Sequence, residues 1–143
     1  MKKSLLTIFC LLFCFDLYCQ SLSLKDILFL TQRESAKSLL VPKGFTFSDY
    51  GHGLEIFFKN KDSATEEKAD FHVYKNAGSV SYTTLDTSYM NTIVKSLYKQ
   101  YKLILKDVSD RETFYQFGDV NINIMVDIIK TPAAKGRISM SKR

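Results

Sequence analysis

Residues 86–103, DTSYMNTIVKSLYKQYKL, contain the clearest helical pattern of the chain. Asp86 or Thr87 is expected to cap the helix, because short oxygen-bearing side chains accept hydrogen bonds from the free N–H groups of a first turn. Apolar side chains then recur every three or four residues, as on one face of a helix: Met90, Ile93, Val94, Leu97 and Tyr101. The stretch therefore predicts an amphipathic helix that covers an apolar surface.

Strand patterns follow this helix. Leu103 and Leu105 alternate with their neighbours over 102–106, and Ser109-Asp110 marks a turn. Residues 114–117 and the alternating stretch 120–128 are expected to form a hairpin around Gly118-Asp119. Alternation with a period of two is typical of a half-buried strand. A last strand through Ile138 and Met140 is expected after a loop at 131–136.

Similar patterns precede the helix. Residues 45–48 and 54–59 alternate around a glycine-flanked turn, and residues 71–73 and 80–82 flank Asn76-Ala77-Gly78. Both pairs predict hairpins, the second with a positive φ at Gly78. The charged stretch 60–69 between them is expected to be a loop.

An earlier helical region begins at Ser23. Asp26 follows three places later, which predicts a cap before the apolar residues 24–30. Thr31 and Glu34 repeat the signal, so we expect a break near residue 31. Pro42 and Gly44 end the region, because the residue before proline avoids helical angles and glycine permits the turn that follows.

The element order is thus helix, strands, helix, strands. Short turns between consecutive strands predict an antiparallel sheet, which we expect helices to cover on one face in an α+β domain over residues 20–143. The halves 22–85 and 86–143 follow the same outline. A tandem repeat would explain this likeness, and chance similarity within an α+β chain is the alternative.

This arrangement resembles the beta-lactamase-inhibitory-protein-like fold, in which two helix-and-strand repeats form one curved sheet. It is also similar to small exported proteins with a helix followed by a glycine-phenylalanine strand start. The residues that carry the resemblance are the capped break at 23–40, the exit Lys43-Gly44-Phe45 and the related exit Tyr101-Lys102-Leu103. It covers residues 22–141 at the level of the fold and transfers no binding residue.

The first 19 residues predict a cleavable signal peptide. Lys2 and Lys3 precede an apolar run that ends at Asp16, and this run is shorter than the roughly 20 residues of a membrane-spanning helix. We expect cleavage between Cys19 and Gln20, and hence a protein of the bacterial periplasm, cell surface or medium with no transmembrane span after cleavage. Lipidation of Cys19 and an uncleaved anchor are the alternatives.

All three cysteines lie in this leader, at positions 10, 14 and 19. Cleavage would leave a disulfide-free chain without a thiolate metal site or a cysteine nucleophile. It would also leave 18 basic and 14 acidic residues, a net charge of +4. These charges are dispersed along the chain, and export disfavours nucleic acid as a partner. No sequence motif predicts a cofactor.

Two sets of residues are candidates for a site. Asp49, His52 and Glu55 surround a turn, and with His72 they would form the centre of a small metal-dependent or hydrolytic enzyme if the strands brought them together. Tyr74, Tyr82 and Tyr115 would instead form an aromatic binding surface on a sheet face without helices. Because no catalytic motif is found, we expect a non-enzymatic interaction or scaffold module whose partner is a protein or an envelope component.

Overall fold

The structure is a computed structural model that describes residues 21–32, 35–51, 53–74, 77–131 and 133–142. Its helices are α2 (Leu24–Leu30), α3 (Lys37–Leu40), the 3₁₀ helix η1 (Val41–Lys43) and α4 (Thr87–Gln100). Its strands are β1 (Thr46–Gly51), β2 (Leu54–Lys59), β3 (Glu67–Tyr74), β4 (Ala77–Thr84), β5 (Lys102–Val108), β6 (Glu112–Gly118), β7 (Ile122–Ile129) and β8 (Lys135–Lys142).

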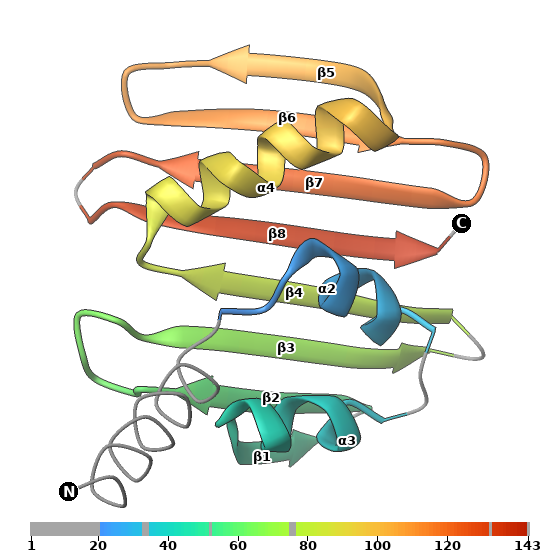
Figure 1. The fold of residues 1–143 in the computed structure, drawn as a ribbon, viewed down its shortest axis with the longest axis vertical. Coiled ribbons are helices and arrows are strands. Elements are labelled where there is room, and N and C mark those ends of the chain that lie inside the picture. Colours follow the sequence, from blue (N-terminus) through green and yellow to red (C-terminus); the bar gives the residue numbers. More distant parts are fainter. Residues whose placement is uncertain (1–20, 33–34, 52, 75–76, 132, 143) are drawn as a thin grey trace, which may run out of the picture.

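The eight strands form one sheet in the order β1-β2-β3-β4-β8-β7-β6-β5 (Figure 1). Every neighbouring pair is antiparallel, so the predicted antiparallel sheet with helices is confirmed. The predicted loop at 60–69 is too long by three residues, because β3 begins at Glu67. Charged residues at 67 and 68 obscured its start, although both pair with β4.

The strands divide into a first half, β1–β4, and a second half, β5–β8, with the same pairing. When the residues of the two halves are matched by their cross-strand partners, Glu67–Tyr74 of β3 corresponds to Ile122–Ile129 of β7. Ala77–Thr84 of β4 then corresponds to Lys135–Lys142 of β8. The same matching places the bulge between Phe47 and Asp49 on the bulge between Leu103 and Leu105. The match pairs Ser81 with Ser139, and these two residues face each other where the halves meet.

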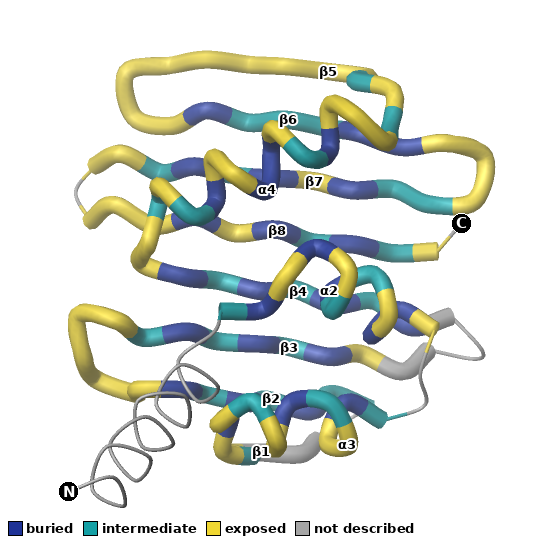
Figure 2. The backbone as a smooth tube through the Cα atoms, in the orientation of Figure 1, coloured by how far each residue is buried: buried dark blue, intermediate teal, exposed yellow. Residues whose placement is uncertain are grey.

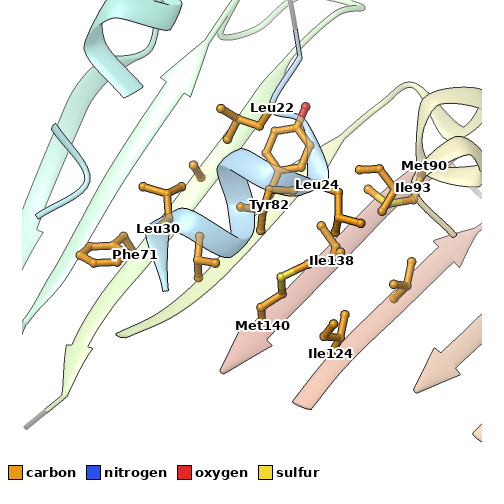
Figure 3. Close-up of a cluster of buried hydrophobic side chains, with 14 of the residues drawn as sticks. Leu22, Leu24, Leu30, Phe71, Tyr82, Met90, Ile93, Ile124, Ile138 and Met140 are labelled. Carbon is orange, nitrogen blue, oxygen red and sulfur yellow. The ribbon is translucent and has the colours of Figure 1, made fainter. Parts of the chain in front are cut away.

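The two faces of the sheet differ in composition. We call the face that carries Val80, Tyr82, Ile138 and Met140 the core face, and the face that carries Ser79, Ser81, Ser139 and Ser141 the serine face. The core residues come mainly from the core face and from α2, α3 and α4 (Figure 2). Figure 3 shows part of this cluster around α2. Burying the core residues is the main favourable contribution to folding.

Two matched glycines let the helices approach the core face. A Cβ at Gly78 would lie 3.0 Å from the carbonyl oxygen of Thr31, and one at Gly136 would lie 2.6 Å from the Cβ of Met90. Gly78 lies within β4, and positive φ among the described glycines occurs at Gly44 and Gly53. The predicted positive φ at Gly78 is therefore wrong, and close helix packing explains this glycine.

The predicted cap at Ser23 is confirmed. Its Oγ accepts the N–H of Asp26 at 3.2 Å, while the Asp26 carboxylate accepts the N–H of Ser23 at 2.9 Å. Lys43 lies 3.1 Å from the same carboxylate. Burial alone would raise the pKa of Asp26, but these partners lower it below its usual value.

The other caps are formed differently. Asp86 caps α4 by accepting the N–H of Tyr89 at 2.9 Å, as predicted. The N-cap of α3 is Ala36, whose side chain cannot accept a hydrogen bond, and the carboxylate of Glu55 on β2 accepts its N–H at 3.0 Å instead. In the described part of the chain, none of the helices is long and apolar enough to cross a membrane.

Candidate binding surface

The centre of the serine face is a strip of small hydroxyl side chains. Ser79 lies opposite Ser141, and Ser81 lies opposite Ser139, whose Oγ is 3.1 Å from that of Ser81. Because serine is smaller than the side chains around it, the strip is hollowed into a groove of about 330 Å³. His72 and Met125 also line this groove, and both are exposed.

Charges beside the groove are neutralised in pairs. Lys68 lies 3.0 Å from Asp70 on β3, and Arg137 contacts Asp127 across β8 and β7 at 2.7 Å. Arg137 donates through both Nε and Nη2 to one carboxylate oxygen, which holds its guanidinium in place. A partner of the groove would therefore meet hydroxyl groups at the centre and paired charges at the sides.

Apolar side chains on the same face lie farther from the centre. Leu54, Ile56 and Phe58 of β2 alternate with buried residues and are half-buried. The ammonium groups of Lys61 and Lys68 lie 5.2 and 5.8 Å from the ring of Phe58. The serine face thus combines a polar centre with an apolar flank on β2, which is the mixed composition of many recognition surfaces.

The prediction that Tyr82 belongs to an exposed aromatic surface is wrong. Its side chain lies on the core face, is 0% exposed and donates its hydroxyl hydrogen to Glu67. Val80, two residues earlier on β4, and Ile138, the partner of Tyr82 on β8, lie on the same face and are buried. Tyr82 therefore belongs to the core. Burial, and then the Glu67 carboxylate, raise the pKa of Tyr82 well above its ordinary value.

Glu67 connects several polar groups below the N-terminal end of α2. One of its oxygens accepts the hydroxyl of Ser21 at 3.3 Å and lies 3.8 Å from the ammonium of Lys59. The side chains of both charged residues are about 5% exposed. Tyr89 donates to the carbonyl of Leu22 nearby, and burial followed by the charge of Glu67 raises the pKa of Tyr89 to about 12.

Tyr115 lies on the core face as well, half-buried beside α4. Its ring stacks on that of Phe117 at 6.1 Å and meets the edge of Tyr98 at 6.3 Å. The side chain of Tyr74 lies outside the described residues. The structure therefore does not gather the predicted tyrosines on a common free surface, since Tyr82 and Tyr115 face the helices.

The predicted acid-base or metal cluster is not assembled from its described members. Glu55 pairs with Phe71 on the core face, where it is 8% exposed and caps α3, whereas His72 pairs with Leu54 on the serine face. Successive residues along a strand point to opposite faces, so His72, which follows Phe71, lies on the face opposite to Glu55. The side chain of Asp49 and the whole of His52 lie outside the part of the chain that the structure describes. Among the described residues there is no group of three metal-ligating side chains.

The strip of serines was not predicted from the sequence. Its signal was the repeated serine at alternate positions 79 and 81 and again at 139 and 141. Only the pairing of β4 with β8 brings the two repeats together. Cys19 and Gln20, the predicted cleavage or lipidation site, lie outside the described residues.

In comparisons with known proteins, no family model, no curated protein and no solved structure matches this chain.

Proposed function

We propose that this chain is an exported, non-enzymatic interaction module of the bacterial periplasm or cell surface, and that its serine face meets a protein or an envelope component. The observation that carries the proposal is the groove at the centre of that face. Here small side chains leave space on the side of the sheet opposite to Tyr82 and the core.

The size of the serine face suits a protein partner. Eight strands spaced about 4.8 Å apart, each about seven residues long, span roughly 800 Å². This is about the area that one partner contributes to a standard protein–protein interface. In this proposal the helices cover the core face alone, and the serine face is left for the partner.

Two further expectations belong to the same proposal. The likeness to the beta-lactamase-inhibitory-protein-like fold concerns architecture alone, and duplication of a helix-and-strand unit would account for the matched pairing of the two halves. Export rests on the first 19 residues. Mass spectrometry of the protein from cells would give an N-terminus at Gln20 after cleavage and an acylated Cys19 after lipidation, while an intact Met1 would contradict both and leave the uncleaved anchor.

Site-directed photo-crosslinking in the native host tests the surface. A photoreactive phenylalanine analogue replaces Met125 on the serine face in one strain and Ser88, which is exposed on α4, in another. We expect a discrete adduct from position 125 and none from position 88. Ser81→Arg fills the groove and should remove the adduct, whereas equal crosslinking from both positions would contradict the proposal.

A further inference from the structure

The two halves differ in how their core faces are covered at one matched corner. In the first half, Ser35 and Ala36, which precede α3, lie against Glu55 of β2, and Ala36 is fully buried there. In the second half, α4 continues directly into β5 without a second helical segment, and the left ends of β5 and β6 have no helix in front of them in Figure 1.

A cleft lies at this second corner. It has a volume of about 370 Å³ and is lined by Thr87 and Asn91 of α4, by Thr113 and Tyr115 of β6, and by Ile128 and Lys130 at the end of β7. Cross-strand matching places Tyr115 on Glu55 and Ile128 on Val73. The cleft therefore lies over Tyr115, at the position where Ser35 and Ala36 lie over Glu55 in the first half.

The surroundings of the cleft are apolar at the floor and basic at the rim. Val108, which pairs with Thr113, is 58% exposed beside it. The Lys106 ammonium lies 5.6 Å from the ring of Tyr115, and that of Lys130 donates to the carbonyl of Ser109 at 2.9 Å. Neither the ring nor the carbonyl in these contacts carries a formal charge.

None of the described residues that line the cleft is acidic, and α4 contains neither Asp nor Glu from Thr87 to Gln100. Glu112 is next to Thr113 but alternation places it on the serine face. Thr87, Asn91, Thr113 and Tyr115 provide side-chain hydrogen-bonding groups that suit a polypeptide backbone.

We propose that this cleft binds an acidic segment of a partner protein, which lies over Tyr115 as Ser35 and Ala36 lie over Glu55 in the first half. The first half supplies the geometry, since Ala36 is buried there and donates its backbone N–H to the Glu55 side chain of β2. Lys106 and Lys130 supply the charge preference. This surface is separate from the serine face, so it stands or falls independently of the proposed function.

Nuclear magnetic resonance on the ¹⁵N-labelled protein, as processed in its host, tests the proposal with two blocked hexapeptides. The acidic peptide TEEDSA keeps the ends of the chain's own segment TQRESA at 31–36, and TKKKSA is its basic counterpart. We expect TEEDSA to produce saturable shifts at the amides of Asn91, Thr113 and Lys130. TKKKSA should produce none.

Matched variants locate the binding. Asn91→Phe fills the cleft and should abolish the shifts, while Thr92→Phe, at the exposed neighbouring position on α4, should leave them. Lys106→Glu should weaken binding about tenfold, whereas Lys61→Glu, in the exposed β2–β3 turn, should have no effect. Unfolding midpoints of all four variants establish that each is folded.

Three results would overturn the proposal. Equal binding of both peptides would remove the charge preference. Shifts centred on Ser81 and Ser139 would move the acidic ligand to the serine face and leave the proposed function in place. Self-association that Asn91→Phe abolishes would identify a second copy of the chain as the occupant of the cleft.

Discussion

The first and second halves share their strand pairing and differ in what they bury. Position 67 is a buried glutamate on β3 and its match on β7 is Ile122; position 55 is a buried glutamate on β2 and its match on β6 is Tyr115. Both halves nevertheless keep the bulge and the glycine beneath a helix. Backbone pairing thus tolerates very different side chains, provided that each buried polar group has a partner.

The largest expected effect comes from the buried charges of the first half. Glu67→Leu removes the carboxylate that Tyr82 and Lys59 share. Breaking a buried ion pair by removing one member costs about 3 to 5 kcal/mol, so the free energy of unfolding should fall by about that amount in urea denaturation. The exposed Glu112→Gln change should alter it by less than about 0.5 kcal/mol. Equal effects of the two changes would show that the Glu67 cluster adds no stability.

The matched glycines should respond unequally to alanine. At Gly136 the new methyl group meets Met90 at 2.6 Å, and overpacking of this kind costs about 1 to 3 kcal/mol. At Gly78 the contact of 3.0 Å is offset by the lower backbone entropy of alanine, about 0.5 to 1 kcal/mol, so the net change should be smaller. Adding Met90→Ala to Gly136→Ala should give a loss of stability below the sum of the two single changes. Strict additivity would contradict the contact.

The matched positions 55 and 115 test the long-range cap. Glu55→Gln should destabilise the protein by about 1 kcal/mol, because a neutral amide is a weaker acceptor for the Ala36 N–H than a carboxylate. Tyr115→Phe keeps the ring stacked on Phe117 and should cost less than about 0.5 kcal/mol. Hydrogen exchange of the Ala36 amide should accelerate in Glu55→Gln alone. Unchanged protection would mean that α3 does not depend on this cap.

Alkaline pH should also weaken the protein. The pKa of Tyr89 is raised to about 12, and that of Tyr82 is raised as well, whereas an unfolded tyrosine titrates near 10. Between these values the unfolded chain loses protons that the folded chain retains, so stability is fully present below pH 10 and falls as the pH rises through 10 to 12. Urea midpoints measured from pH 8 to 11 check the direction. A flat profile in the wild type, or one unchanged by Tyr89→Phe, would contradict it.

Local sequence signals predicted the elements well and the site poorly. The caps at Ser23 and Asp86 and the stripe of Met90, Ile93 and Leu97 depend on residues within a few positions of each other, and they are found where expected. The predictions of Tyr82 and Glu55 as site residues are wrong, because the groups that contact these side chains come from segments distant in sequence. The tyrosine hydroxyl reaches Glu67, and the Glu55 carboxylate reaches Ala36.

The sequence by itself determined that this protein alternates helices with antiparallel strands, because periodicity, turn residues and caps act over short distances along the chain. Tertiary structure alone decided which surfaces could be sites. The serine groove exists because β4 pairs with β8, and the cleft beside α4 exists because the second half lacks a counterpart of Ser35 and Ala36. Both features join residues far apart in sequence, and no local pattern encodes their proximity.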